Sequence, residues 1–524
     1  MFATVPECTL FVFSINPFDK EEAKEAMEAV KRTAKVVELE QGKKINFIEV
    51  WSDNAIGFSN AVNKGYRELV RVVGGEDNLP ETIIVSNDDV YVADNWIEGF
   101  QRGLQTPYVH VASSLEGVGK PIENNEEFKV GVCVPVSNGV YNEQRINFSG
   151  TLQHLQNKDP FTINNEIRNN PQTKGIFVYL NKISGFIFAA KTQLIVDLCQ
   201  ENYSYGGFLD DKNFPVGGFD DDDLSIRVTE LGWKMVLSRE LYVAHKAHST
   251  LGKYHKEKQN GLKNRINFYK KYEEETQREK KVVGCYRVAI KTVNDILQLR
   301  GSLQKASTAL DGFALLLTNN PSMALYGYDG QLAQRLPPRE AQLLANCENL
   351  TNEELAKEFE DWCYAVTQDV KSSGFDRIKR EDVSVEVWEG DFNERIERNR
   401  SHIIAESIGA DWIFSIDHDE ILEDRITRSH IDKCVKNPNP HVMSYSVGWI
   451  NHYESMSLFR TDYPYCIGYK TGMFGQRLWK VIKKSPMRIT SGTDIGLHCG
   501  NSPEYSLSVT KGTGIRFRHL SGLR

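Results

Sequence analysis

The chain has 524 residues, of which 40% are hydrophobic and 26% charged, and its formal net charge is −8 at pH 7. This length exceeds what one hydrophobic core usually holds, so two or three domains are expected. The negative charge disfavours nonspecific binding to nucleic acid, and no apolar run approaches the length of a membrane-spanning helix. The nine cysteines lack CxxC spacing, which argues against a zinc module and predicts reduced thiols in a cytoplasmic protein.

The first half of the chain alternates predicted strands and helices. Residues 9–16 are apolar, of strand length, and lack the basic segment of a signal peptide, so they predict a first strand. An amphipathic helix is expected over 19–37, a second strand over 45–50, and a second helix that ends at about Val73. Because strands alternate with helices, we expect a parallel sheet with right-handed crossovers.

Two apolar stretches end abruptly in acidic residues. They are residues 81–92 and 411–422, and their acidic ends are Asn87-Asp88-Asp89 and Asp417-His418-Asp419. Ligands bind at the carboxyl ends of strands in open α/β sheets, and carboxylates buried there need a cation nearby. We therefore expect a metal and phosphate site in each half.

The rest of the first half contains a run of acids and two histidines. Residues 107–174 are rich in Asn, Gly and Pro and predict loops with short strands. A glycine-rich turn then leads to four aspartates, 220–223, before a helix predicted over 224–231. A strand leads on to His245 and His248, and a charged helix within 253–281 closes the first domain.

The second half repeats this plan. Strands are expected over residues 282–288, 313–318 and 383–387, and helices over 290–303 and 393–408, with a helical insertion near 337–372. In both halves a helix that bears an asparagine, Asn63 or Asn399, precedes the acidic strand end at similar spacing. The pattern predicts a diverged internal duplication at the scale of a domain.

The acidic strand ends suit a hard divalent cation. Mg²⁺ and Mn²⁺ take oxygen ligands and often keep substrate phosphates in their coordination shell. A metal held in this way bridges a diphosphate and stabilises the charge that develops as the diphosphate leaves. The alternative is that Asp88 and Asp89 cap a turn, and the presence of two equivalent strand ends favours the metal.

The aspartate run has two interpretations that are compatible with each other. Four adjacent carboxylates repel one another, which raises the pKa of some of them, and one near an acceptor hydroxyl could act as a general base. The same residues could instead be acids in the first turn of a helix, favoured by its dipole. A histidine such as His245 could complete a metal shell, although single histidines are more often structural.

The first half resembles the family 2 glycosyltransferases of the GT-A fold over residues 9–272. The likeness lies in an N-x-x-G-F helix start, the NDD motif, and an F-D-D-D-D-L-S-I-R segment similar to the family's F-E-D-x-D-L-S-x-R. The resemblance implies a metal contact, a base and donor contacts at defined positions. These are Asp89 and His245 for the metal, Asp221 for the base that deprotonates the acceptor, and Asn54, Asn63 and Asp88 for the nucleotide-sugar.

The second half resembles an F-N-E…R-N…G-A-D-W…D-x-D-E branch of the same family. The resemblance implies that Asn399 and Asp417 contact a nucleotide-sugar and that Asp419 and His519 contact a metal. No E-D-x-D-L segment follows, so the base is unassigned, with Asp494 and Glu504 as candidates. Neither half has the family's early Asp-x-Ser-x-Asp, which leaves the donor open.

Together these features predict an α/β protein with two tandem GT-A domains, Rossmann-like with mostly parallel sheets, over residues 1–275 and 282–524. We expect a glycosyltransferase, dependent on Mn²⁺ or Mg²⁺ and inverting, that moves a hexose or pentose from UDP or another nucleoside diphosphate to an acceptor hydroxyl. The acceptor could be a glycan, a lipid-linked sugar, a protein or a modified nucleobase.

Several alternatives remain. The two domains could add two sugars in sequence, or one could be active while the other scaffolds or binds the acceptor. A metal-dependent nucleotidyltransferase or phosphohydrolase also gathers carboxylates at strand ends. Intact acidic motifs in both halves argue against a binding protein whose sites have decayed.

Overall fold

A computed structural model describes most of the chain as two compact units, Met1–Tyr272 and Glu273–Arg524. The described residues are all except 1–5, 7–8, 18, 55, 115–116, 125–127, 141–143, 147–149, 202–206, 216–217, 247–256, 326–335, 371–376, 391–393, 454, 460–474, 482–509 and 520–524. In the part of the chain that the structure describes, no helix combines the length and apolar character needed to cross a membrane.

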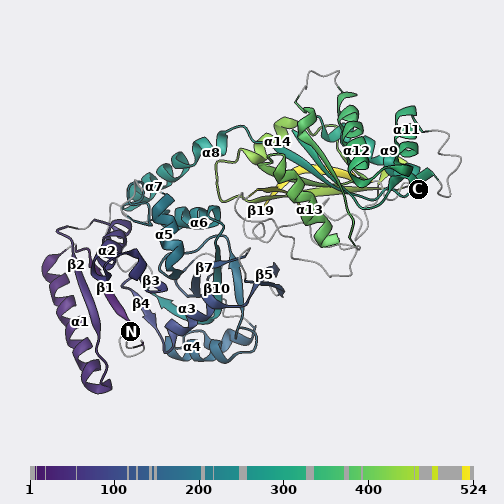
Figure 1. Cartoon of the computed structure of the whole chain (residues 1–524). Coiled ribbons are helices and arrows are strands. Elements are labelled where there is room, and N and C mark those ends of the chain that lie inside the picture. Colours follow the sequence, from purple (N-terminus) through teal and green to yellow (C-terminus); the bar gives the residue numbers. More distant parts are fainter. Residues whose placement is uncertain are drawn as a thin grey trace. The chain divides into compact units, whose positions relative to one another are not determined.

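The first unit begins with a small parallel sheet. Strands β1 (Leu10–Ile15) and β2 (Asn46–Trp51) pair in parallel and are joined by α1 (Lys20–Gln41), which lies along them in Figure 1. The Asp19 side chain caps α1 by accepting hydrogen bonds from two backbone amides of its first turn. Helix α2 (Phe58–Val73) follows, and a left-handed Gly74 ends it.

The main sheet of the first unit is mixed. Its order is β3 (Thr82–Ser86), β9 (Ile187–Lys191), β7 (Val130–Val136), β10 (Lys234–His245), β8 (Phe177–Leu180), β5 (Tyr108–Ser114) and β6 (Gly117–Glu123), and β4 (Val90–Val92) pairs with β10. Strands β7 and β10 are parallel, as are β5 and β8. The described partner of β3 is β9, and this pair is antiparallel. The parallel arrangement is therefore confirmed for β1 and β2 but wrong for β3.

Among the described residues of the first unit, five further helices occur. They are α3 (Trp96–Gln105), α4 (Pro160–Asn169), α5 (Thr192–Glu201), α6 (Asp220–Glu230) and α7 (Glu257–Lys271). Apolar residues of α5 and α6, such as Leu194 and Val228, pack with β7 and β10 in one buried cluster. Helix α6 starts at Asp220, four residues earlier than predicted, so all four aspartates lie in its first turn.

The second unit is built on a parallel core. The order of its sheet is β13 (Val383–Val387), β12 (Gly312–Leu317), β11 (Val282–Val288), β14 (Trp412–Asp417), β18 (Gly475–Lys480), β16 (Ser444–Tyr453), β19 (Thr510–His519) and β15 (Glu420–Leu422), and β17 (Ser455–Phe459) pairs with β16. The first four strands are parallel. The chain order reverses between β11 and β14, which is where open α/β sheets bind ligands.

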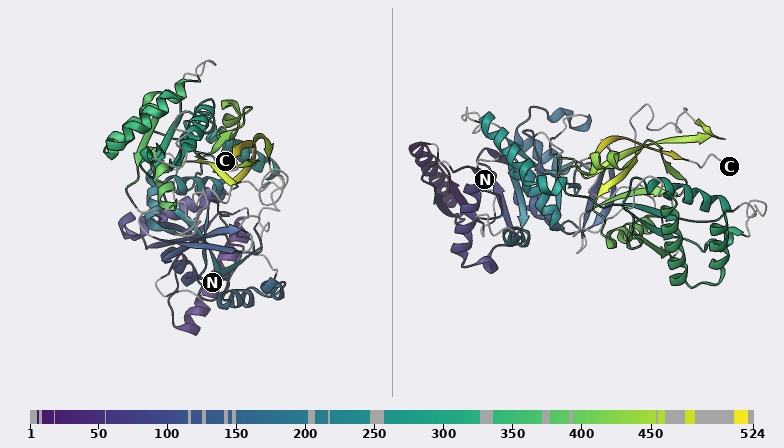
Figure 2. Two further views of the ribbon diagram at one scale, coloured as in Figure 1. Left: turned by 90° about the vertical axis from the view of Figure 1, so that its right-hand side faces the viewer. Right: turned by 90° about the horizontal axis from the view of Figure 1, so that it is seen from above.

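The described helices of the second unit are α8 (Glu273–Gln277), α9 (Val293–Ala306), α11 (Pro338–Asn346), α12 (Asn352–Gln368), α13 (Glu394–Ser407) and α14 (Arg428–Val435). Short 3₁₀ turns occur in both units at η2 (Glu76–Asn78), η3 (Gly150–Leu155), η5 (Pro321–Leu325), η6 (Cys347–Asn349) and η8 (Arg380–Asp382). Helix α12 packs on β13 and α9, and α13 packs on β11 and β12. Two further views show strands between helices in each unit (Figure 2), so the predicted α/β class is confirmed.

Candidate active site

The acidic end of β3 meets the end of β10. Asp89 lies in the turn between β3 and β4, and β4 pairs with the last residues of β10 so that Val90 is opposite His245. This register brings the His245 Nε2 atom to 3.2 Å from the Asp89 Oδ1 atom, with both side chains about seven-eighths buried (13% and 12% exposed). The backbone amide of Lys246 also donates to the Asp89 carbonyl oxygen at 3.0 Å. Two residues far apart in the sequence thus form one polar pair.

The His245 ring is held in a fixed orientation. Its Nδ1 atom is 3.2 Å from the carbonyl oxygen of Gly139, which can only accept, so Nδ1 carries a proton. The ring also stacks on Phe186, with ring centroids 4.8 Å apart, and the His245 amide donates to the Asn138 side chain at 3.1 Å. Nε2 is therefore the ring nitrogen that faces Asp89.

This pair fits a divalent cation. A histidine that binds a metal through Nε2 commonly donates its Nδ1 proton to a backbone carbonyl oxygen. A carboxylate oxygen is a preferred ligand of Mn²⁺ and Mg²⁺. Among the described residues, no three histidine, cysteine, aspartate or glutamate side chains gather into a metal-binding group. The described residues would thus supply two donors, with diphosphate oxygens and water as further ligands.

Asp221 lies in the first turn of α6 and has the pKa of a base that works near neutral pH. Its Oδ1 atom accepts from the Asp222 amide at 2.9 Å, and its Oδ2 atom accepts from the Gly185 amide at 3.2 Å. Burial, followed by the charges of Asp220 and Asp222, raises the pKa of Asp221 to about 7. The Lys182 ammonium pairs with Asp222 and opposes this rise.

The segment Gly185–Phe186 contacts both Asp221 and His245. The Gly185 amide binds the Asp221 carboxylate, and the next residue, Phe186, stacks on His245. The Phe186 carbonyl oxygen also accepts from the Asn87 amide at 2.8 Å. A Cβ atom at position 185 would lie 3.2 Å from the Asp221 Cβ atom, so glycine suits this close approach. The expected metal pair and the expected base therefore both contact one short segment.

The turn that presents the aspartates is strained. Phe219 precedes α6 with φ 69° and ψ −2°, a left-handed conformation that bulky residues rarely adopt, and Gly218 before it has φ 85°. The Phe219 ring lies against Phe268 of α7, with centroids 5.2 Å apart. Such strain persists only where surrounding contacts hold it, and it is common at functional sites.

The residues of the first unit expected to contact the donor differ in their exposure to solvent. Asp88 is more exposed than Asp89, and the pKa of its carboxyl group is raised, first by loss of solvent and then by the charge of Asp89. Asn54 is exposed between β2 and α2. Asn63 is fully buried, and its amide group binds the loop that precedes α6.

The second unit repeats the register of the first. Glu420 of β15 pairs with His519 of β19, as Val90 pairs with His245. Counting back from these pairs aligns Asp419 with Asp89, His418 with Asp88, and Asp417 with Asn87. The side chain of His519 lies outside the described residues, as do His248, His498, Asp494 and Glu504.

Asp417 stands among arginines at the reversal point of the second sheet. Its carboxylate accepts from Arg398 at 2.9 Å and from Arg477 at 3.2 Å, and Arg477 also binds Glu420 at 2.9 Å. Burial alone raises the pKa of Asp417, but the two guanidinium groups hold it well below its usual range. In the same unit, Asn399 is half-buried on α13, and His418 lies 3.7 Å from Asp295.

Sequence reasoning missed the residues that orient the site. Asn138 and Gly139 fall in a stretch predicted as loops, and Lys182 and Phe186 carry no motif. Arg398 belongs to the R-N segment of the second half, but the pairing of Arg398 and Arg477 with Asp417 depends on a strand that returns late in the chain. A sequence pattern does not show contacts of this range.

Comparisons with known proteins leave the family open. No protein-family model and no curated protein sequence matches the chain. A crystal structure of GalNAc-T7 with UDP, GalNAc and Mn²⁺ is similar at a TM-score of 0.26 and 14% identity, over 45% of this chain and 36% of that one. The apo structure of the bifunctional glycosyltransferase WbbM is similar at a TM-score of 0.17 and 8% identity, over 77% of this chain and 65% of that one. The chain thus spans less than two thirds of either structure, and similarities this low carry no argument about its activity.

Proposed function

We propose that the first unit is a metal-dependent, inverting glycosyltransferase that moves a sugar from a nucleotide-sugar to an acceptor hydroxyl. The observation that supports this most strongly is that the Asp89–His245 pair and Asp221 are linked through two adjacent residues, Phe186 and Gly185. A cation site and a base in this arrangement are what the transfer of a sugar from a diphosphate requires.

Each residue of the proposed site has its own role in the reaction. Asp89 and His245 would hold Mn²⁺ or Mg²⁺, which when bound neutralises the charge of the departing diphosphate. Asp88 would contact the donor. Asp221 accepts the proton of the acceptor hydroxyl, whose oxygen forms the new bond to the anomeric carbon as the bond from that carbon to the diphosphate oxygen breaks. A single displacement of this kind inverts the configuration at that carbon.

We propose that the second unit is a related donor site, which makes the protein bifunctional. The shared register of the His245 and His519 strands supports this. The two arginines on Asp417 neutralise its charge, so we assign the metal contacts to Asp419 and His519 rather than to Asp417. If the second unit does not transfer sugar, it would scaffold the first unit or bind the acceptor.

The acceptor is a hydroxyl of a glycan, a lipid-linked sugar, a protein or a modified nucleobase. We expect the protein in a reducing, cytoplasm-like compartment. The described cysteines that support this are free thiols, at positions Cys133, Cys199, Cys285, Cys347, Cys363 and Cys434.

A donor panel tests the proposed function. Thermal shift with Mn²⁺ and a set of UDP-, GDP- and dTDP-sugars should show stabilisation by one donor class, and mass spectrometry should then detect transfer or slow hydrolysis of that sugar. Release of a nucleoside diphosphate supports the proposal. Release of a nucleoside monophosphate or of inorganic phosphate would instead indicate a nucleotidyltransferase or phosphohydrolase.

A further inference from the structure

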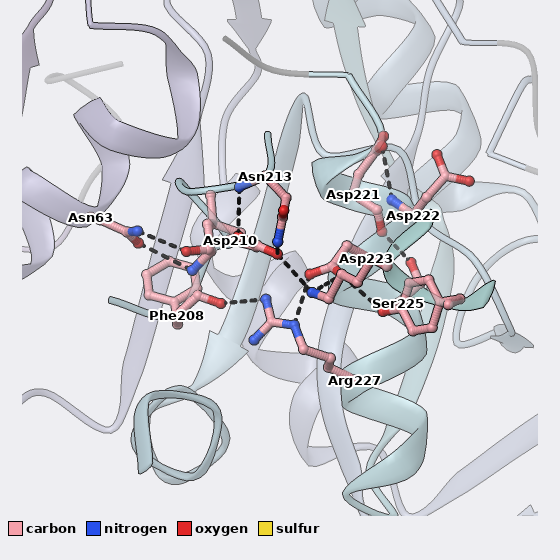
Figure 3. A network of polar contacts seen from close by, with 12 residues as sticks. Asn63, Phe208, Asp210, Asn213, Asp221, Asp222, Asp223, Ser225 and Arg227 are labelled. Atoms are coloured by element: carbon pink, nitrogen blue, oxygen red, sulfur yellow. Dashed lines mark hydrogen bonds and ion pairs between the residues drawn. The ribbon is translucent and has the colours of Figure 1, made fainter. Parts of the chain in front are cut away.

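Asn63 is part of a buried network that reaches the helix of the expected base (Figure 3). Its Nδ2 atom donates to the Leu209 carbonyl oxygen at 2.8 Å and to the Asp211 carboxylate at 2.9 Å, and its Oδ1 atom accepts from the Leu209 amide at 3.1 Å. A Cβ atom at Gly207 would lie 2.5 Å from Asn63 Oδ1, so the backbone passes directly over the amide group. These contacts use both donors and the oxygen of the side chain within the protein.

The loop that Asn63 binds continues to α6. The Phe208 carbonyl oxygen accepts from Arg227 of α6 at 2.7 Å, and Arg227 also binds Asp223 at 2.8 Å. Asp210 accepts from Lys271 of α7 at 2.7 Å. The loop is thus bonded to α2 on one side and to α6 and α7 on the other.

Asp223 is the point at which these contacts converge. It is fully buried, two residues from Asp221 on the same helix, and it binds Arg227, Lys271 and the Tyr272 hydroxyl, the last at 2.8 Å. Among the groups around Lys271, Asp210 and Asp223 carry two negative charges and Lys271 and Arg227 carry two positive charges, so these four charges cancel as long as all of them are in place. Displacing the loop would leave buried charges without partners, which is costly.

We propose that Asn63 is a positioning residue that holds Asp221 through this network and is not a contact of the donor. Asn63 fixes Leu209–Asp211, this loop fixes Asp223 and Arg227, and these residues fix the first turn of α6. The kinetic part of this inference rests on the proposed role of Asp221 as the base. The link between Asn63 and α6 does not depend on that role.

Hydrogen exchange tests the link without any substrate. In Asn63→Ala, the amides of residues 207–213 and 220–230 should exchange about tenfold faster or more, because the loop loses its anchor. Asn60→Ala is the matched control, since Asn60 lies on the same helix and binds only the Ile56 carbonyl oxygen nearby. Unchanged exchange in 220–230 of Asn63→Ala would overturn the proposal.

Steady-state kinetics distinguish positioning from donor binding. Asn63→Ala should lower kcat about tenfold or more with the donor KM unchanged within about twofold. A raised donor KM with unchanged kcat would make Asn63 a donor contact and contradict the proposal. If the wild type shows no transfer, the proposed function fails, and the exchange result still decides whether Asn63 holds α6.

A double variant that exchanges the residues at positions 63 and 211 keeps the test informative if Asn63→Ala does not fold. Asn63→Asp alone places a second carboxylate against Asp211 and should be impaired. Adding Asp211→Asn restores a donor opposite the carboxylate at position 63 but leaves the Leu209 carbonyl oxygen without its donor, so part of the lost protection in 220–230 should return. No recovery would show that the contact between residues 63 and 211 does not transmit order to α6.

Discussion

Asp221 combines a raised pKa with two backbone hydrogen bonds that fix its carboxylate. The Gly185 and Asp222 amides bind one oxygen each, and burial, followed by the charges of the neighbouring acids, raises the pKa of the carboxyl group. A carboxyl group with a pKa near the working pH is an efficient proton acceptor. The residue thus has both the placement and the proton affinity that the proposed displacement requires.

Replacing Asp221 by Asn should remove the base and keep the size and shape of the side chain. The amide oxygen can still accept from Gly185, so donor binding should persist while sugar transfer falls by about 10²- to 10⁴-fold. The matched control is Asp222→Asn, which breaks the ion pair with Lys182 but leaves the base. Equal losses in the two variants would show that Asp221 has no special role.

The pH dependence of transfer should follow the same carboxyl group. Because the base must be unprotonated, kcat/KM should rise with pH and level off above about 7, the pKa of Asp221. A rate profile that is flat between pH 5 and 8 would contradict the assignment.

The free energy of unfolding should fall as pH rises, whereas kcat/KM rises. The folded pKa of Asp221, about 7, lies above the ordinary value of 3.8, so the folded state binds more protons between these values. The contribution of Asp221 to the free energy of unfolding therefore falls as pH rises through this window and no longer changes above it. Asp220, whose pKa burial raises to about 6, adds to the same trend. Urea unfolding of wild type and Asp221→Asn at pH 5 and pH 8 should show a smaller fall in the variant.

At the scale of elements, α7 holds α6 through Lys271. Its ammonium bridges two fully buried carboxylates, Asp210 and Asp223, while Tyr272 and Phe268 of the same segment pack beside them. A buried bridge of this kind is tolerated only with all its partners present.

Lys271→Met should therefore destabilise the first unit by about 3–5 kcal/mol, because it leaves buried charges uncompensated. Lys270→Met, at the exposed neighbouring position, should change stability by less than about 0.5 kcal/mol. Calorimetry of both variants measures this difference. Equal transition temperatures would show that the bridge does not support α6.

The elements that sequence predicts best are those whose signals are local. The amphipathic period of residues 19–37 predicts α1 except for its last four residues, and the apolar run of β3 with its acidic end is equally clear. The start of α6 was misplaced because Phe219 adopts a left-handed conformation that the sequence does not indicate. The antiparallel neighbour of β3 and the burial of Asn63 were missed because both depend on segments more than 100 residues away.

At the scale of the whole molecule, the two units share one arrangement at their acidic strand ends. A short strand follows the acidic turn, and a late strand returns beside it with a histidine at the same register position. The units differ two residues before Asp89 and Asp419. Asn87 stands there in the first unit, and Asp417 with its two arginines stands there in the second. This difference is consistent with two donor sites that have diverged.

Single-site variants separate the possible roles of the two units. Under the bifunctional proposal, Asp89→Ala and Asp419→Ala should each yield product that lacks one sugar, as measured by product mass. Full product from Asp419→Ala would assign scaffolding or acceptor binding to the second unit. Loss of all product in both variants would indicate one shared activity.

Asp89 and His245 are proposed to form the site for the metal and the diphosphate of the sugar donor. Titration calorimetry with the nucleoside diphosphate of the donor found in the panel measures this directly, in the presence and absence of Mn²⁺. We expect Mn²⁺-dependent binding in the wild type and in Asp221→Asn, and a loss of at least about tenfold in Asp89→Ala and His245→Ala. Binding that is independent of Mn²⁺, or unchanged in Asp89→Ala, would contradict the account.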